Sequence, residues 1–180
     1  MMKRYLPSVF FSAVFFLGVF LSGCGYSTRS LLPGNIRTIH IPPFKNKVAY
    51  TTENTRRLYL PLLELKVRNA VADRFLFDGH LRVEESERAD VVLKGDLIGY
   101  ERDVLRYTDN NDVLEYRIRI TVSLELWDAV KEKTIWTEPS FSGETTFFAT
   151  GAQAKSENTA LEEALTDLAR RIVERTIEDW

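Results

Sequence analysis

The chain has 180 residues, and its 24 lysines and arginines against 26 aspartates and glutamates give a formal net charge of -2. Hydrophobic residues make up 44% of the chain and charged residues 28%, which are ordinary values for a globular protein and exclude a disordered, collagen-like or multi-span membrane chain. The balance of charges also argues against a nucleic-acid-binding protein, because neutralising phosphates takes a surplus of basic side chains.

The first 23 residues have the pattern of an export signal. Lys3 and Arg4 carry the early positive charge, and an apolar run from Val9 to Phe20 follows with no charged side chain. A permanent membrane anchor would look similar, because about 20 apolar residues can span a bilayer. Length alone does not separate these two alternatives.

The residues that end this run do separate them. Leu21-Ser22-Gly23-Cys24 resembles the lipobox of bacterial lipoproteins, in which the cysteine sulfur receives a diacylglyceryl group and the signal is cut just before that cysteine. Cys24 is the single cysteine of the chain, so an intrachain disulfide is impossible. We therefore expect residues 1–23 to be a lipoprotein signal peptide and Cys24 to be the lipidation site, with acyl chains such as palmitate as the anchor.

A short tether is predicted between the lipid and the folded domain. Residues 24–35 are rich in small and turn-forming residues, and residues 36–180 are expected to form a single domain without internal repeats. Lipoproteins that stay in the inner membrane often carry aspartate after the lipidated cysteine, whereas Gly25 follows Cys24 here. By this resemblance the protein is anchored in the outer membrane and faces the periplasm.

The domain opens with a predicted strand and a predicted helix. Apolar residues from Ile36 to Ile41 indicate a strand that ends at Pro42-Pro43, and the polar residues 45–55 indicate a loop. A helix is expected from Pro61 to Phe75, ended by Asp78-Gly79. Its apolar face, at spacings of three and four, consists of Leu63, Val67, Ala70, Val71 and Phe75.

A series of strands is expected next. A short strand covers residues 81–83, and a longer one covers residues 89–107 with two interior glycines, Gly95 and Gly99, which often mark a bulge or a close approach. After a turn at 109–112, apolar and polar residues alternate through a strand at 113–127. Such alternation predicts one buried face, and one face that is wet or shared with a partner.

The end of the chain is predicted to form one more strand and a second helix. The strand is expected at residues 133–143 and a loop at 147–156, in which Phe147-Phe148 either inserts into a partner groove or folds back over the core edge. The helix is expected from Thr159 to Ile177, with Thr159 and Glu162 at capping-box spacing.

These elements predict an α+β fold. We expect a two-layer sandwich in which an antiparallel or mixed sheet of about four strands carries both helices on one face, in the order β-α-β-β-β-α. The first strand has no hairpin neighbour, so its crossover allows it to pair in parallel.

Several segments of the chain match one known family in their order. These segments are Cys24-Gly25-Tyr26, Ile39–Asn46, Phe75–Val83, Ala89–Gly95, Glu115-Tyr116-Arg117, and Trp136 ahead of Ser142-Gly143. With a lipobox in front of them, the chain resembles the LptE family of lipoproteins, which act in the assembly of lipopolysaccharide (LPS). The resemblance implies a protein that plugs the LptD β-barrel of the outer membrane, helps that barrel to assemble, and assists the insertion of LPS into the outer leaflet.

Charge placement gives candidate LPS-binding residues. Arg117 and Arg119 point to one face of the 113–127 strand, Arg102 and Arg106 lie on its hairpin partner, and Lys94 lies further along that partner. Guanidinium groups suit the phosphates of lipid A, which accept two hydrogen bonds side by side. We expect these five residues to be where LPS binds.

The same arginines could instead have a purely structural role as partners in ion pairs across the hairpin. If Glu101 lies opposite Arg119 and Asp103 opposite Arg117, the arginines form solvated cross-strand pairs. If instead Arg102 lies opposite Arg119, positive charge is left unpaired and available to a ligand. The register of the hairpin decides between these two alternatives.

An enzyme, a metal site and a cofactor are not expected. The two histidines, His40 and His80, are isolated from any acidic or thiol group at ligand spacing. The sequence has no glycine-rich phosphate loop, no Gly-x-Ser-x-Gly and no His-Glu-x-x-His motif. The expected partners are therefore an LptD-like barrel, LPS, and a membrane reached through the lipid anchor.

A second functional class remains in competition. A lipid-anchored periplasmic domain could activate a cell-wall synthase, or serve an ABC lipid transporter as an auxiliary subunit. Activators that reach across the periplasm usually have a long disordered linker, whereas the tether here ends at about residue 35. The short tether favours the LPS-assembly function.

Overall fold

The computed structural model describes residues 36–49, 60–86 and 88–178. The predicted signal peptide (1–23), the lipidation site Cys24 and the tether (24–35) lie outside the described residues. The described elements are β1 Thr38–His40, β2 Lys45–Asn46, α2 Leu63–Asp78, β3 Arg82–Glu84, β4 Val91–Tyr107, β5 Val113–Asp128, β6 Lys133–Phe148 and α3 Glu157–Glu178.

The strands form one mixed sheet in the order β3-β1-β4-β5-β6, with β2 also paired to β4. The strand β1 is parallel to both of its neighbours, as predicted, whereas β4, β5 and β6 are antiparallel. The sequence predicts about four strands, and the described residues contain six. Five of the six fall on segments predicted as strands, so the expected total of about four was too low. The sixth, β2, lies in the predicted 45–55 loop and is too short, at two residues, to show any periodicity.

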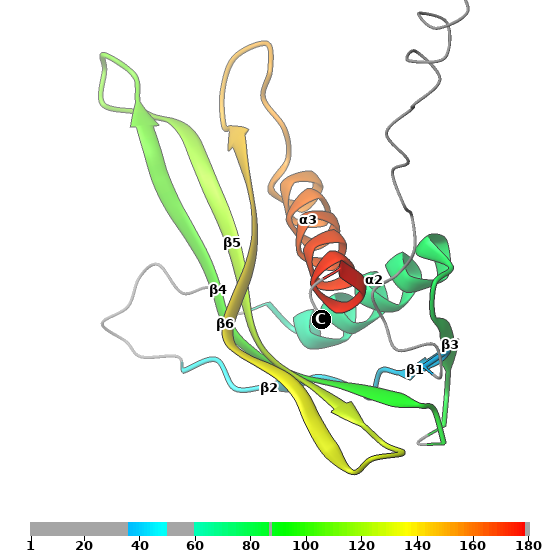
Figure 1. Ribbon diagram of the computed structural model, residues 1–180. Coiled ribbons are helices and arrows are strands. Elements are labelled where there is room, and N and C mark those ends of the chain that lie inside the picture. The colour runs from blue at the N-terminus through cyan, green and yellow to red at the C-terminus, as the bar shows by residue number, and fades with distance from the viewer. Residues whose placement is uncertain (1–35, 50–59, 87, 179–180) are drawn as a thin grey trace, which may run out of the picture.

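Both helices cover the same face of the sheet, which confirms the predicted two-layer α+β sandwich (Figure 1). Helix α3 packs on β6 and β5, and α2 packs beside α3 and β3. The core lies between the layers, where the alternating apolar residues of β5 from Ile118 to Leu126 meet the apolar stripe of α3. No helix of the described ranges is both long enough and apolar enough to cross a bilayer.

The first helix follows its predicted pattern closely. Leu63, Val67, Val71 and Phe75 are buried at intervals of four residues, and Ala72 is buried in addition. The helix ends as expected, because Gly79 adopts a left-handed conformation (φ 78°) and its N–H donates to the carbonyl of Phe75 at 3.0 Å.

The second helix begins two residues before its predicted start. The Oγ of Ser156 accepts a hydrogen bond from the N–H of Thr159 at 3.1 Å, so Ser156 is the N-cap of a helix that starts at Glu157. The predicted capping box of Thr159 and Glu162 is wrong. The Thr159 hydroxyl is instead within hydrogen-bond distance of the Ser156 hydroxyl, at 2.8 Å.

The last strand is longer than predicted. It continues to Phe148, because Phe147 pairs with Tyr116 and Phe148 with Glu115 on β5. Phe147 is buried, and its ring stacks on that of Tyr116 with the centroids 5.6 Å apart. Phe147 therefore folds back over the core edge, which is the second of the two alternatives predicted for Phe147-Phe148. The predicted loop at 147–156 therefore begins only at Ala149.

The two glycines of β4 serve the two purposes predicted for them. The register of β4 against β5 shifts between Leu97 and Gly99, which is a bulge. At Gly95, a Cβ atom would lie 2.4 Å from the ring of the buried Phe44, so only glycine allows that ring to pack on the strand.

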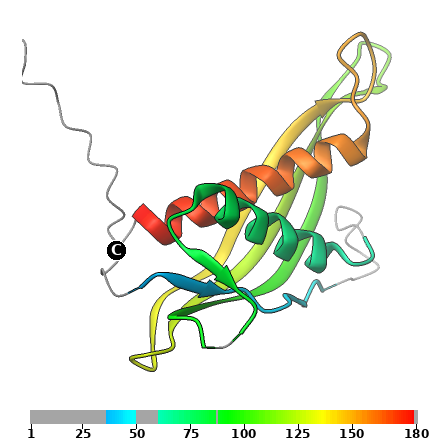
Figure 2. The same ribbon diagram turned by 90° about the vertical axis from the view of Figure 1, so that its right-hand side faces the viewer.

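The molecule has two distinct ends (Figure 2). At one end, which we call the Ile36 end, β1 begins, α2 finishes, and the β5–β6 turn lies at residues 129–132. At the other, the hairpin end, the β4–β5 turn at 108–112 projects beside the loop at 149–156.

Candidate functional site

The five candidate basic residues do not form one cluster. The face of the sheet that is turned away from α2 and α3, here called the outer face, carries Arg117 and Arg119, which alternate with the buried Ile118 and Ile120. Arg102 lies opposite Ile118 in the register and therefore points to the helix side.

A second irregularity of β4 places Arg106 on the outer face. The register shifts between Val104 and Arg106, so that Arg106 lies opposite Glu115. Lys94 also lies on the outer face, opposite Glu125, but Glu125 is six residues along β5 from Arg119, or about 20 Å. The structure thus brings Arg106, Arg117 and Arg119 onto one face, and leaves Lys94 and Arg102 apart from them.

The register of the hairpin decides between the two alternatives left open by the sequence. Glu101 lies opposite Arg119, and Asp103 lies opposite Arg117. The alternative register, with Arg102 opposite Arg119, is wrong. A shift of one residue would turn the buried Tyr100 out of the core, which fixes the observed pairing.

Most of the candidate cations already have carboxylate partners. Arg119 donates from both Nε and Nη2 to Oε2 of Glu144, at 3.0 Å in each case. Arg106 donates from Nε to Glu115 at 2.5 Å, and this bond holds the pKa of the Glu115 carboxyl below its usual value. These contacts are cross-strand pairs at the surface.

Arg117 differs from its neighbours on the outer face. Its Nε is buried and has no hydrogen-bond acceptor among the described residues. An Arg guanidinium has five N–H donors in a fixed fork, so a guanidinium with an unused donor can still bind an additional oxyanion. Because this Nε is buried, a phosphate arriving from solvent would have to be met by the other nitrogens of the Arg117 guanidinium.

A hollow of about 540 Å³ lies beside these arginines on the outer face. Its lining includes Glu101, Arg119, Thr121, Glu144 and Arg171. A larger groove of about 890 Å³ lies towards the Ile36 end, and Lys94 is among its lining residues. In that groove the Lys94 ammonium lies 4.8 Å from the centre of the Trp127 ring and 3.4 Å from Glu125.

Arg102 belongs to a link between the hairpin and α3 that the sequence did not indicate. The carboxylate of Glu157 accepts hydrogen bonds from Arg102 and, at 3.3 Å, from the hydroxyl of Tyr100. The Arg102 guanidinium also lies over the ring of Tyr116, 4.9 Å from its centre. Burial, and then the charge of Glu157, raise the pKa of Tyr100 to about 12.

The Tyr100 hydroxyl is expected to keep its proton in the folded protein up to about pH 12. Because this pKa lies above the ordinary value of 10, the contribution of the group to stability is complete below pH 10 and is lost as the pH rises towards 12. Urea unfolding between about pH 8 and pH 12 measures this loss, which should be smaller in Tyr100→Phe. The exposed Tyr107 supplies the control, Tyr107→Phe, and equal pH dependence of Tyr100→Phe and the parent would contradict the prediction.

The described residues contain no group of three or more His, Cys, Asp and Glu side chains that could hold a metal ion. Nδ1 of His40 lies 2.9 Å from the carbonyl oxygen of Glu84, and Nδ1 of His80 lies 2.7 Å from the Asp78 carboxylate. Both histidines thus have local structural partners.

A model of the LptE family, described as lipopolysaccharide-assembly, matches residues 36–176. The chain belongs to the LptE family. The match covers the sandwich except for the last two residues of α3, and it includes all five basic candidates. No curated protein is significantly similar in sequence to this LptE-family chain.

Solved structures show the same fold at low sequence identity. Protein XCC0632 from Xanthomonas campestris is 14% identical with a TM-score of 0.58, over 83% of this LptE-family chain and 91% of its own. A hypothetical protein from Chlamydia trachomatis is 15% identical with a TM-score of 0.53, over 78% and 95% of the two chains. An uncharacterized lipoprotein B from Nitrosomonas europaea is 12% identical with a TM-score of 0.52, over 79% and 83%.

Proposed function

We propose that this LptE-family protein is an outer-membrane lipoprotein that sits as a plug inside an LptD-like β-barrel. In this role it helps the barrel to assemble and assists the insertion of LPS into the outer leaflet, without catalysing a reaction. The observation that carries the proposal is the family match over residues 36–176. The lipobox at Leu21-Ser22-Gly23-Cys24 supports anchoring through Cys24, followed by a tether at 24–35 and one domain at 36–180.

The outer face of the sheet has the chemistry that a barrel lumen requires. The lumen of a transmembrane barrel is polar and wet, so a plug needs a rigid polar surface. In the middle of the outer face, Thr121 and Ser142 lie opposite each other, and next to them Arg119 is paired with Glu144. Hydroxyls and compensated charges of this kind can form hydrogen bonds with a polar wall without leaving a buried charge alone.

The function is tested by purifying the chain from detergent-solubilised outer membrane. A large β-barrel recovered at equal stoichiometry supports the plug function. Recovery with a peptidoglycan synthase, or with an inner-membrane ABC transporter, would instead favour the alternative of a cell-wall activator or a transporter auxiliary. Mass spectrometry of the same sample tests the anchor, because a chain that retains residues 1–23 and a free Cys24 thiol would contradict it.

LPS binding is proposed to involve the arginines of the outer face at the hairpin end, with Arg117 and Arg119 as the main contacts. Replacing both by glutamate should weaken LPS binding by roughly tenfold to a hundredfold, since a hydrogen bond to a charged group is worth about 1.5–3 kcal/mol. Binding of labelled LPS to the purified protein measures the change, with circular dichroism to verify the fold.

A matched control changes the same amount of charge elsewhere. Lys66→Glu with Arg170→Glu alters two exposed cations of the helical layer, which pair with acidic side chains on α3. This control variant should bind LPS like the parent. Equal LPS binding by the Arg117 and Arg119 variant and by the parent would reject the proposed site.

A further inference from the structure

Two large apolar side chains are exposed at the end of α2. Phe77 is 81% exposed and Leu76 is 62% exposed, although Phe75 beside them is fully buried. The guanidinium of Arg74 lies over the Phe77 ring, 5.2 Å from its centre. This combination suits a boundary between an apolar phase and water. The ring and the leucine can enter the apolar side while the cation stays in water.

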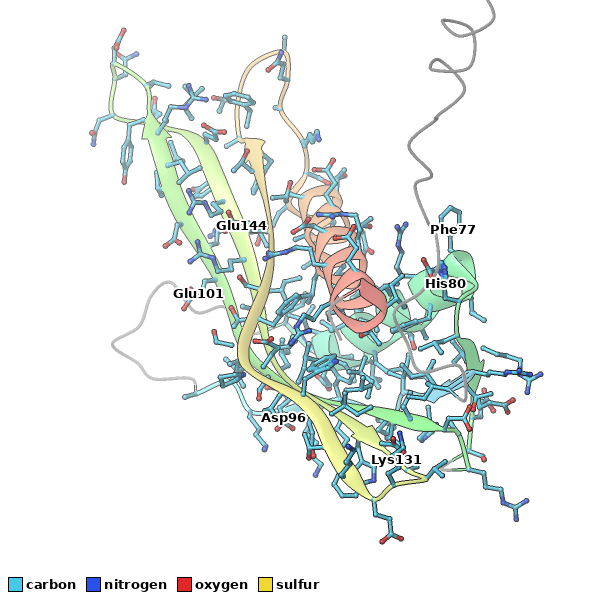
Figure 3. All side chains as sticks on the ribbon, viewed as in Figure 1. Phe77, His80, Asp96, Glu101, Lys131 and Glu144 are labelled. Carbon is cyan, nitrogen blue, oxygen red and sulfur yellow. The ribbon has the colours of Figure 1, made fainter. Side chains whose placement is uncertain are left out.

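This pair lies at the Ile36 end of the molecule. Helix α2 finishes at Asp78, and the chain turns at Gly79 directly into β3, where the N–H of Arg82 donates to the carbonyl of Arg37 at 2.9 Å. Figure 3 shows Phe77 and His80 together at this end of α2, with their side chains directed away from the core. The exposed pair therefore lies at the same end of the domain as the first described residue, Ile36.

The length of chain in front of Ile36 limits how far this end can be from a membrane. The step depends on the proposed function, in which Cys24 carries the lipid. Residues 24–35 number twelve and span at most about 40 Å when fully extended. Helix α3 alone, with 22 residues, is about 33 Å long. The sheet is longer still, because strand β4 with 17 residues spans about 56 Å. A tether of at most about 40 Å therefore keeps the Ile36 end of the domain close to the bilayer.

We propose that Leu76 and Phe77, with Arg74 beside them, form a contact with the surface of the lipid bilayer. Leucine and phenylalanine side chains enter the headgroup region of a membrane, and an aromatic ring favours that region in particular. Charges near the pair are mixed, with Arg74 and Arg82 against Asp78 and Glu84, so attraction to anionic lipids contributes little. The contact is apolar and is expected to depend weakly on salt.

The contact is tested on the full lipidated chain in vesicles of phosphatidylethanolamine and phosphatidylglycerol. Because the thiol of Cys24 is used by the lipid, His80→Cys introduces one free thiol next to Phe77, and an environment-sensitive fluorophore is attached to it. The matched control is Leu65→Cys, an exposed residue of the same helix about 18 Å before Phe77. A quencher attached to the lipid chains reports whether each fluorophore touches the bilayer.

We expect quenching at position 80 to be at least twice that at position 65, and to fall to the level of position 65 when Leu76→Gln and Phe77→Gln are added. Equal quenching at both positions would overturn the proposal. The proposal would also be overturned if the fluorophore at position 80 were shielded from water but not quenched by the lipid. In that case a second copy of the chain or another protein would cover Leu76 and Phe77.

Purifying the same labelled chain from detergent-solubilised outer membrane, beside the vesicle measurement, separates this contact from the plug function. If the labelled chain is recovered with a β-barrel while the fluorophore at position 80 stays in water, only the membrane contact is wrong. If position 80 is quenched by lipid and no barrel is recovered, the contact stands and the plug function is wrong.

Discussion

Replacing Gly143 by alanine is expected to lower the free energy of unfolding by about 2–3 kcal/mol, which is a decrease in Tm of roughly 5–10 °C. Gly143 is on β6 where α3 crosses the strand. A Cβ atom there would lie 2.4 Å from Cβ of Leu168 and 2.5 Å from its Cα and N. Because two of these atoms belong to the helix backbone, a change of rotamer does not relieve the overlap, and the whole helix must move away from the sheet.

Gly99→Ala is the matched control for this experiment. At Gly99 the nearest heavy atom to an added Cβ is Cβ of Thr121, at 3.4 Å, which is an ordinary contact. The change in unfolding free energy should stay within about 0.5 kcal/mol. Thermal unfolding followed by circular dichroism measures both variants. A Gly143→Ala protein as stable as Gly99→Ala would show that α3 does not lie this close to β6.

The close approach at Gly143 also explains how the edge of the sheet is protected. Strand β6 has a neighbour on only one side, and an uncovered edge strand can pair with other chains. Side chains of α3 bond to the free edge instead. Arg171 donates to the carbonyl of Ser142, and Asp167 accepts from the N–H of Glu144 at 3.2 Å. The helix must lie against the strand for the short side chain of Asp167 to reach it.

Most of the fold could be predicted from the sequence, because its signals are local and repeated. The alternation through β5 and the spacing of Leu63, Val67, Val71 and Phe75 on α2 each require a particular face to be buried, and the structure buries it. The failures occur where a partner distant in sequence decides. Phe147 joins β6 because Tyr116 is opposite it, and Glu115 is buried because Arg106 reaches it across a bulge.

The candidate site was less accessible to prediction for the same reason. Lys94, Arg102, Arg106, Arg117 and Arg119 all lie on the predicted hairpin, but two bulges in β4 determine which of them share a face. A bulge changes the face of every later residue, and its position depends on packing that a single sequence does not display. The pairing of Arg102 with Glu157 joins residues 55 positions apart, so no local pattern could indicate it.

Replacing Asp90 by alanine should lower the free energy of unfolding by about 1.5–3 kcal/mol, because it removes a charged acceptor at the start of β1. One oxygen of this carboxylate, Oδ2, accepts from the backbone N–H groups of Arg37 at 2.8 Å and Thr38 at 3.0 Å, and from the Thr38 hydroxyl at 3.0 Å. The Asp90 N–H donates to that hydroxyl in return, at 2.9 Å. These bonds hold the first described strand against β4, just where the proposed tether enters the domain.

The effect of Asp90 should depend on pH in a defined direction. The hydrogen bond from the N–H of Arg37, followed by those from Thr38, holds the pKa of the carboxyl below its ordinary value, although partial burial opposes them. A lowered pKa in the folded state means that the stabilisation is complete well above pH 4 and is lost as the pH falls through the folded pKa. The free energies of unfolding of Asp90→Asn and the parent, measured with urea, should therefore differ most near pH 7 and converge below about pH 4.

Asp109→Asn, in an exposed turn, is the control, and its free energy of unfolding should show no such convergence with that of the parent. If Asp90→Asn differed from the parent equally near pH 7 and below pH 4, the charge of Asp90 would not be what fixes the start of β1.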